Sequence, residues 1–200
     1  KKLADRAARL YEFCRFVDDI ADGDLPHRHE TLEDISQSLI HHQVSAGTEV
    51  QAFLQLANDI DIPIIAATEL LDGMLLDQQP TAVKDEAELL RYCHAVAGTV
   101  GLMMCRVLDC QHRRADQFAI DLGIAMQLTN IARDVLEDAK MGRRYIPADW
   151  ANYTAEDIAQ AQTQCRDSVA MATQRLLNLA EKYYTSALLG IQLLPFRSRF

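Results

Sequence analysis

The chain has 200 residues, of which 49% are hydrophobic, and its formal net charge is −9. This length suits one domain with a substantial core, no apolar run approaches the roughly 20 residues of a membrane span, and the acidic balance argues against nucleic-acid binding. Five cysteines without a Cys-x-x-Cys spacing argue against a disulfide framework or a zinc site. We therefore expect one cytoplasmic domain over residues 1–200.

The first expected helix spans residues 1–21. Positions three and four apart share a helix face, so one polar stripe is formed by Tyr11, Arg15, Asp18 and Asp22. Apolar side chains fill most of the remaining circumference, namely Leu10, Phe13, Cys14, Phe16, Val17 and Ile20. A helix of this pattern is buried on more than one side, and carboxylates on such a helix are costly unless they face a positive charge.

Three helices are expected next. The first would span residues 31–43, with Thr31 and Asp34 as a capping box. The second would span residues 49–58, and Pro63 would open the third.

Asp72 and Asp77 lie towards the end of that third helix. Residues five apart share no helix face well. The preferred interpretation is a solvated helix end, with a functional signature as the alternative.

A long helix is expected from residue 86 to about residue 110, with Gly98 and Gly101 in its middle. Each glycine costs about 1 kcal/mol relative to alanine in a helix interior. Close packing of a neighbouring helix and room for a ligand both explain this cost. The apolar side chains around the glycines favour a hydrophobic tunnel; they are Val96, Ala97, Val100, Leu102, Met103 and Met104.

A second polar stripe follows on a later helix, formed by Gln127, Asn130, Asp134 and Asp138. Carboxylates four apart repel by a few tenths of a kcal/mol, whereas three oxygen ligands at this spacing suit a hard divalent cation. A solvated helix face is the alternative. The opposite face is apolar, and the polar stripe continues upstream through Met126, Gly123 and Ala119. One side of this helix is therefore ionic at one end and small or apolar at the other.

The last part of the chain begins with the basic run 140–144, which supplies positive charge beside the second stripe. Thr154 and Asp157 form a capping pair. Residues 157–189 are expected to be helical, in two pieces.

Two acidic stripes on largely buried helices are explained if they face each other across something positive. Magnesium bridging a diphosphate meets this need, because magnesium prefers carboxylates together with phosphate oxygens.

These two stretches resemble the paired aspartate motifs of the squalene and phytoene synthases, the head-to-head prenyl synthases. The first motif reads Tyr-x-x-Cys-Arg-x-x-Asp-Asp-x-x-Asp over residues 11–22, and the second runs from 127 to 138 and on into Gly-Arg-Arg-Tyr-Ile-Pro at 142–147. Residues 92–104 resemble the central helix of bacterial phytoene synthases, and residues 71–77 resemble a further family signature. The resemblance implies an all-α, isoprenoid-synthase-like helical bundle around a central cavity. Family members have further segments at both ends, so the chain is expected to be truncated at both.

The resemblance also implies roles for individual residues. Magnesium, with manganese as the alternative ion, would be held by Asp18, Asp22, Asn130, Asp134 and Asp138. Substrate contacts would come from Tyr11, Arg15, Tyr92, Val96, Val100, Gln127, Asn130, Arg133 and Arg143. The catalytic set would be Asp18, Asp22, Asp134, Asp138 and Tyr145. Apolar walls that exclude water would be built from Val96, Val100, Met103 and Met126.

The implied reaction is a magnesium-dependent condensation of two prenyl diphosphates. Geranylgeranyl diphosphate would give phytoene through a cyclopropyl diphosphate, in carotenoid biosynthesis. The alternatives are squalene or dehydrosqualene synthesis from farnesyl diphosphate, and a non-catalytic relative that acts as an assembly factor. A plain helical binding module would leave both acidic stripes unexplained.

NADPH is not expected as a cofactor, because the chain has no Gly-x-Gly-x-x-Gly turn between a strand and a helix. Prenyl diphosphates are the expected binding partners of a monomer or homodimer, with no nucleic acid. A lipid product would favour contact with a membrane surface.

Overall fold

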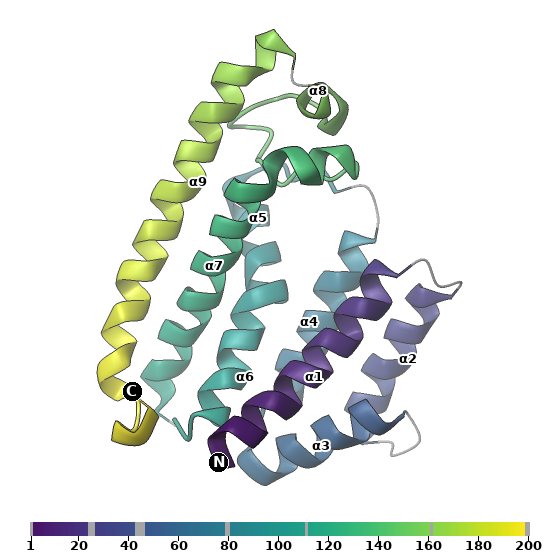
Figure 1. The fold of residues 1–200 in the computed structure, drawn as a ribbon, viewed down its shortest axis with the longest axis vertical. Coiled ribbons are helices and arrows are strands. Elements are labelled where there is room, and N and C mark those ends of the chain that lie inside the picture. The colour runs from purple at the N-terminus through teal and green to yellow at the C-terminus, as the bar shows by residue number, and fades with distance from the viewer. Residues whose placement is uncertain are drawn as a thin grey trace.

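The computed structural model describes residues 2–23, 27–42, 47–78, 81–110, 112–160 and 162–198, and these residues are mostly helical (Figure 1). The β-structure recorded for them is one isolated bridge between Ala82 and Arg144. The expected all-α class is therefore confirmed. Part of each of the loops after residues 22, 42 and 78 lies outside the described residues.

The helices are as follows: α1 Lys2–Asp22, α2 Arg28–Ile40, α3 Thr48–Ile60, α4 Ile64–Asp77, α5 Glu86–Cys93, a π-helix His94–Gly98, α6 Thr99–Val107, α7 Arg113–Lys140, α8 Ala155–Ala159, α9 Thr163–Gly190, and 3₁₀ turns Ile191–Leu193 and Phe196–Ser198.

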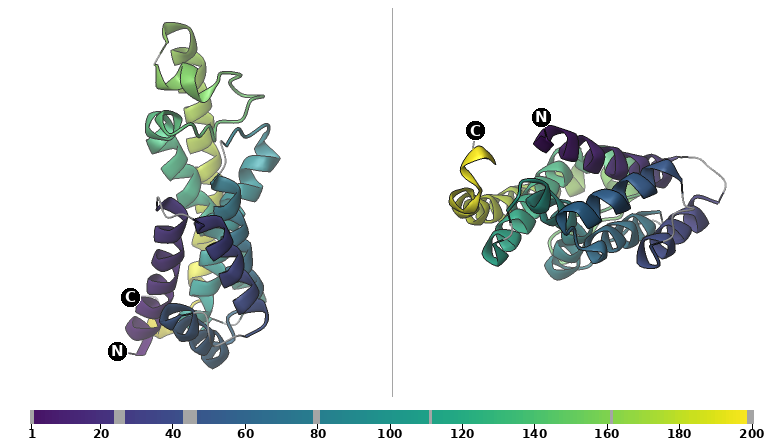
Figure 2. Two further views of the ribbon diagram at one scale, coloured as in Figure 1. Left: turned by 90° about the vertical axis from the view of Figure 1, so that its right-hand side faces the viewer. Right: turned by 90° about the horizontal axis from the view of Figure 1, so that it is seen from below.

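Helices α1 to α4 and α6 enclose one hydrophobic core, in which the rings of Phe13 and Phe53 stack with centroids 3.9 Å apart. A second core lies among α5, α7, α9 and the segment 145–153. The two longest helices, α7 and α9, run antiparallel side by side (Figure 1). Figure 2 shows the same arrangement from two further sides.

Two expected boundaries were wrong. Helix α2 begins at Arg28 rather than at Thr31, and the Thr31 hydroxyl donates to the backbone oxygen of His27 instead of capping the helix. The long helix from Glu86 contains a π-helix and ends at Val107. By contrast, the capping box of Thr154 and Asp157 is present, and the helical stretch after it is divided in two as expected.

The glycines of the central helices allow close packing. A Cβ at Gly101 would overlap the carbonyl oxygen of Ala119, and a Cβ at Gly123 would overlap that of Ala97. The backbone of α6 and of the π-helix therefore lies directly against α7. Of the two explanations for Gly101, close helix packing is confirmed.

Helix α7 bends at Asp134, where the backbone leaves helical geometry with φ −104° and ψ 15°. The bend turns the last part of α7 across the upper ends of its neighbours (Figure 1). An ideal helical periodicity predicted that Asp134 and Asp138 are stacked along one straight helix. Because of the bend, they are not.

None of the helices within the described residues is long and apolar enough to span a bilayer.

Candidate active site

An acidic cavity of about 460 Å³ lies where the C-terminal ends of α1 and α4 meet the π-helix and the bend of α7. Its lining residues are Asp18, Ala21, Asp22, Met74, Asp77, Gln78, Tyr92, Val96, Gln127, Asn130, Ile131, Arg133, Asp134, Asp138, Arg143 and Tyr145. The two polar stripes therefore face one cavity. Nearly all the residues expected from the sequence to bind metal or diphosphate lie in this lining.

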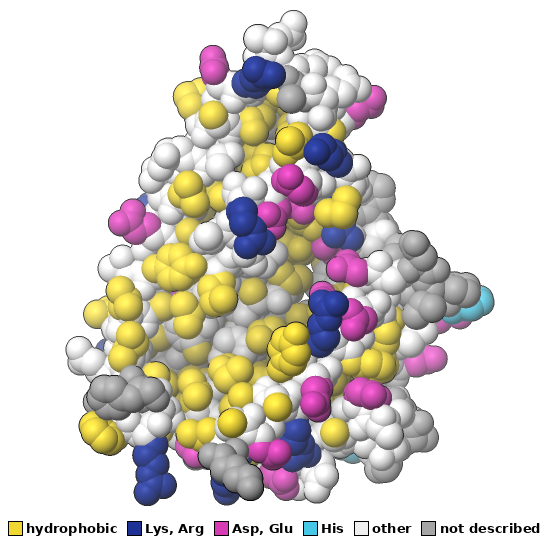
Figure 3. All heavy atoms as spheres, in the orientation of Figure 1, with side chains coloured by type: hydrophobic (Ala, Val, Ile, Leu, Met, Phe, Trp, Pro, Cys, Tyr) yellow, Lys and Arg dark blue, Asp and Glu magenta, His cyan; other side chains and the backbone are white. Residues whose placement is uncertain are grey.

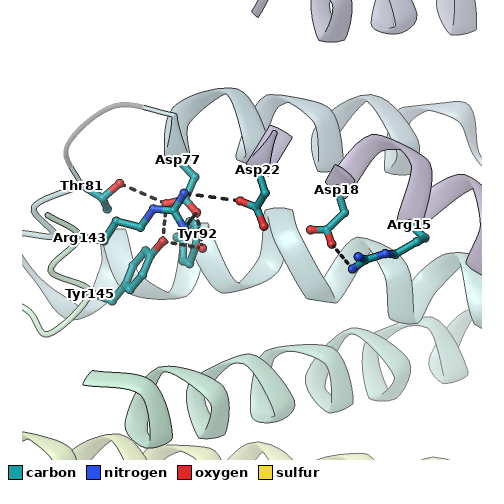
Figure 4. Close-up of polar contacts among 8 residues, drawn as sticks. All are labelled: Arg15, Asp18, Asp22, Asp77, Thr81, Tyr92, Arg143 and Tyr145. Carbon is teal, nitrogen blue, oxygen red and sulfur yellow. Dashed lines mark hydrogen bonds and ion pairs between the residues drawn. The ribbon is translucent and has the colours of Figure 1, made fainter. Parts of the chain in front are cut away.

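The α1 side of the cavity carries Asp18 and Asp22. Burial and the charge of Asp22 raise the pKa of Asp18 above its ordinary value, and Arg15 only partly offsets this. The Arg15 guanidinium lies 3.2 Å from the Asp18 carboxylate (Figure 4) and 2.8 Å from Asp19, and Arg15 is not part of the lining. This wall of the cavity therefore holds more negative than positive charge.

The α7 side carries Asn130, Arg133, Asp134 and Asp138. Arg133 donates from Nε and from a terminal nitrogen to the two oxygens of Asp134, at 2.7 and 2.5 Å. This hydrogen bonding holds the pKa of Asp134 below its ordinary value. Burial and the charge of Asp134 raise the pKa of Asp138 to about 6. The second stripe thus contains one carboxylate that is paired with an arginine, Asp134, and one whose negative surroundings are not fully offset by nearby positive charge, Asp138.

Arg143 lies close to two acidic side chains of the cavity lining, Asp22 and Asp77. Its guanidinium is 3.6 Å from Asp22 and 3.9 Å from Asp77, and its side chain is 24% exposed (Figure 4). Arginine suits a bidentate contact with phosphate. Together with Arg133, it places positive charge in the cavity lining as well as negative.

Asp77 was interpreted as part of a solvated helix end, and this was wrong. Its side chain is only 18% exposed, and it accepts hydrogen bonds from the hydroxyls of Thr81, Tyr92 and Tyr145 (Figure 4). The distances from Thr81 and Tyr92 are both 3.2 Å. Asp72, five residues earlier, is exposed as expected. The sequence signal for Asp77 was its place in the family-like run 71–77.

Two tyrosines complete this part of the lining. The rings of Tyr92 and Tyr145 stack with centroids 4.8 Å apart, and their hydroxyl oxygens are 3.2 Å apart. Burial, followed by Asp77, raises the pKa of Tyr92, and burial, followed by Tyr92 and Asp77, raises that of Tyr145. Both phenols therefore stay neutral at physiological pH.

Several expected residues lie elsewhere. The Tyr11 side chain is 66% exposed and does not line the cavity. Arg15 does not line it either and forms ion pairs with Asp18 and Asp19. Met103 was expected in an apolar wall, but it is fully buried in the core around α1 and α4. The one-dimensional pattern marked these side chains as polar or apolar without showing which neighbour each one faces.

An apolar groove of about 450 Å³ adjoins the acidic cavity, between α6, α7 and α9. The two spaces share three lining residues, Val96, Gln127 and Asn130. Ala119, Gly123 and Met126 line the groove but not the acidic cavity, as the apolar continuation of the α7 stripe predicted, and Val100 lines it as an expected apolar wall residue. Figure 3 shows hydrophobic side chains gathered over the region of these helices, with charged side chains gathered beside it.

The acidic cavity offers oxygen donors to a metal ion from both of its walls. In the described ranges, no three or more Asp, Glu, His or Cys side chains are grouped closely enough to hold a metal alone. Magnesium usually takes one or two carboxylates and completes its shell with phosphate oxygens and water. The pair of aspartates on each wall therefore supplies the number of protein ligands that such an ion needs. The oxygen donors and the raised pKa values of Asp18 and Asp138 fit a hard divalent cation that binds together with a diphosphate.

Comparison with known proteins gives one consistent result. The family model described as "Squalene/phytoene synthase" matches residues 1–200. A phytoene synthase from Pseudescherichia vulneris is 38% identical over 98% of this chain and 70% of the relative, and a 15-cis-phytoene synthase from Enterobacter agglomerans is 36% identical over 94% and 68%.

Solved structures match as well. The squalene synthase HpnC from Alicyclobacillus acidocaldarius superposes with a TM-score of 0.82 at 22% identity, covering 98% of this chain and 76% of that one. A dehydrosqualene synthase in complex with a ligand gives a TM-score of 0.78 at 27% identity, covering 100% and 71%.

Proposed function

The chain belongs to the squalene/phytoene synthase family, and from this premise we propose that it condenses two molecules of geranylgeranyl diphosphate head to head to give phytoene, in carotenoid biosynthesis. The observation that carries the proposal is the junction of an ionic cavity with an apolar groove at Val96, Gln127 and Asn130. A prenyl diphosphate has the same two parts, a charged head and a long hydrocarbon tail.

The length of the groove supports a twenty-carbon substrate. Along α7 the groove runs from Asn130 to Ala115, and fifteen residues of helix rise about 22 Å. An extended carbon chain advances roughly 1.3 Å per bond from its bond length and angle. The sixteen main-chain carbons of a geranylgeranyl group therefore extend about 20 Å, and the twelve of a farnesyl group about 14 Å.

The diphosphate would lie in the acidic cavity. Arg133 and Arg143 would bind phosphate oxygens, and Asp18, Asp22, Asn130, Asp134 and Asp138 would hold magnesium. When bound, magnesium neutralises charge on the leaving diphosphate, so that an allylic carbocation becomes accessible. The double bond of the second substrate then attacks the cation, and loss of a proton closes the ring to a cyclopropyl diphosphate. This intermediate loses the second diphosphate as it rearranges in the same space, and loss of a further proton gives the hydrocarbon.

The protein must also keep water from the cation, because water would quench it. Met74 and Ile131 provide apolar surface within the acidic cavity, and Val96 does so at its junction with the groove. Tyr92 and Tyr145 present aromatic surface that is able to stabilise a passing positive charge.

Release of diphosphate tests this function. The purified protein should release diphosphate from geranylgeranyl diphosphate when magnesium is present and should release none in excess EDTA. Absence of release under both conditions would contradict the proposal and favour a non-catalytic relative. Squalene or dehydrosqualene synthesis is the second candidate, favoured by the likeness to the dehydrosqualene synthase structure. Faster turnover of farnesyl diphosphate would support it.

A further inference from the structure

Asp77 differs from the other carboxylates of the acidic cavity in what its oxygens contact. It is the last residue of α4, and hydroxyl groups from three separate segments donate to it. Arg143 lies farther away, at 3.9 Å. Its acceptor sites are therefore occupied by groups of the protein itself, which sets it apart from the proposed magnesium ligands.

The hydroxyl hydrogens of Tyr92 and Tyr145 are donated within this cluster. A phenol has a single hydrogen to donate. The hydroxyl of Tyr145 donates to Asp77, while that of Tyr92 lies within reach of both Asp77 and the oxygen of Tyr145. In either arrangement both hydrogens are used inside the cluster. The oxygen lone pairs and the ring faces then remain to meet whatever occupies the cavity.

We infer that Asp77 is a positioning residue, which acts through Tyr92 and Tyr145 by holding their hydroxyl hydrogens away from the cavity. This inference rests on the proposed function, in which a carbocation forms beside the two tyrosines. A phenol that donates to a carboxylate carries more negative charge on its oxygen, since hydrogen bonds in a chain polarise one another. The cluster thus places electron density towards the cation without offering it a free hydroxyl hydrogen.

Loss of the Asp77 charge should change both the rate and the fate of the cation. When the C–O bond of a prenyl diphosphate breaks, both electrons leave with the diphosphate. A water molecule that reaches the cation forms a new C–O bond and loses a proton, which gives a prenyl alcohol. Asparagine at position 77 could donate from its amide to the tyrosine oxygens and free their hydrogens, so the cation would form more slowly and water would capture a larger share of it.

The experiment compares Asp77→Asn with Asp72→Asn, which makes the same chemical change on the same helix at an exposed position. We expect kcat of Asp77→Asn to fall about 10- to 100-fold, the range for losing a charge-assisted hydrogen bond. KM for geranylgeranyl diphosphate should not rise, because Arg143 loses a competing carboxylate. The fraction of geranylgeraniol per diphosphate released should increase at least twofold. Asp72→Asn should match the wild type in all three.

A second series shows whether Asp77 acts through Tyr145. The loss of kcat in the double variant Asp77→Asn/Tyr145→Phe should be smaller than the product of the two single losses, because non-additive effects mark residues that act as a unit. Tyr145→Phe alone should also raise the alcohol fraction, and this holds the inference to a test even if Asp77→Asn does not fold. Fully additive losses in kcat, or unchanged alcohol fractions in both single variants, would overturn the inference.

The proposed function and this inference fail in different ways. If the wild type releases no diphosphate, the proposed function fails and the inference falls with it. If the wild type is active and Asp77→Asn keeps its kcat and its product ratio, only the inference fails. A mere loss of folded protein would lower kcat without changing the alcohol fraction.

Discussion

Replacing Asp138 by asparagine should stabilise the metal-free protein at alkaline pH. In the folded protein, burial and the neighbouring Asp134 raise the Asp138 pKa from 3.8 to about 6. Ionised Asp138 is therefore less favourable in the folded chain than in the unfolded chain. Its contribution to stability is fully present below pH 4 and is lost as pH rises through 6.

The size of the effect follows from the pKa shift. A shift of about 2 units corresponds to at most about 3 kcal/mol, and solvent screening of this partly exposed group reduces that to about 1 kcal/mol. The asparagine variant should thus unfold about 2–4 °C higher than the wild type at pH 8 in EDTA, the shift expected for a chain of this size.

Thermal unfolding at pH 5 and pH 8 checks this, with Asp149→Asn as the control at an exposed site. The gain for the asparagine variant should be clear at pH 8 and smaller at pH 5, and the control should show none. Magnesium should then raise the unfolding temperature of the wild type more than that of Asp138→Asn, because a bound ion stabilises the folded state. The reasoning is refuted if the variant is no more stable than the wild type at pH 8, or if the gain is the same at both pH values.

Two further outcomes are expected. Gly123→Ala should lower the free energy of unfolding by about 2–3 kcal/mol, because the new methyl group would overlap the carbonyl oxygen of Ala97 and force the helices apart; urea unfolding measures this, and a loss below about 0.5 kcal/mol would contradict the close packing. Addition of NADPH should change neither the rate nor the product, because the proposed reaction ends by proton loss rather than hydride transfer. Appearance of squalene on adding NADPH would instead favour the second candidate function.

Helical periodicity was sufficient for the two polar stripes that line the acidic cavity, and the family resemblance supplied the fold class. The spacing of Asp18 and Asp22, and of Asn130 and Asp134, places each pair on one helix face whatever the tertiary structure. Burial of the other faces then forces the two polar stripes towards a shared space. For the same reason, the continuation of the α7 stripe through Gly123 indicated the apolar groove.

The missed features depend on contacts between distant residues. Two partners of Asp77, Tyr92 and Tyr145, lie 15 and 68 residues away in the sequence, so no local pattern marks Asp77 as partly buried. Met103 sits on the same helical segment as Val100, and only the placement of α1 and α4 assigns it to the core. The sequence around Asp134 contains no proline or glycine, so the bend of α7 could not be predicted from it.

The product formed from geranylgeranyl diphosphate tests the central claim most directly. The purified protein, supplied with this substrate and magnesium, should form a forty-carbon hydrocarbon with a central double bond, identified as phytoene by mass spectrometry and its absorbance spectrum. Two diphosphates should be released per hydrocarbon, and EDTA should abolish both products. Conversion of the substrate to geranylgeraniol alone, with no forty-carbon product, would contradict head-to-head condensation in the joined cavity and groove.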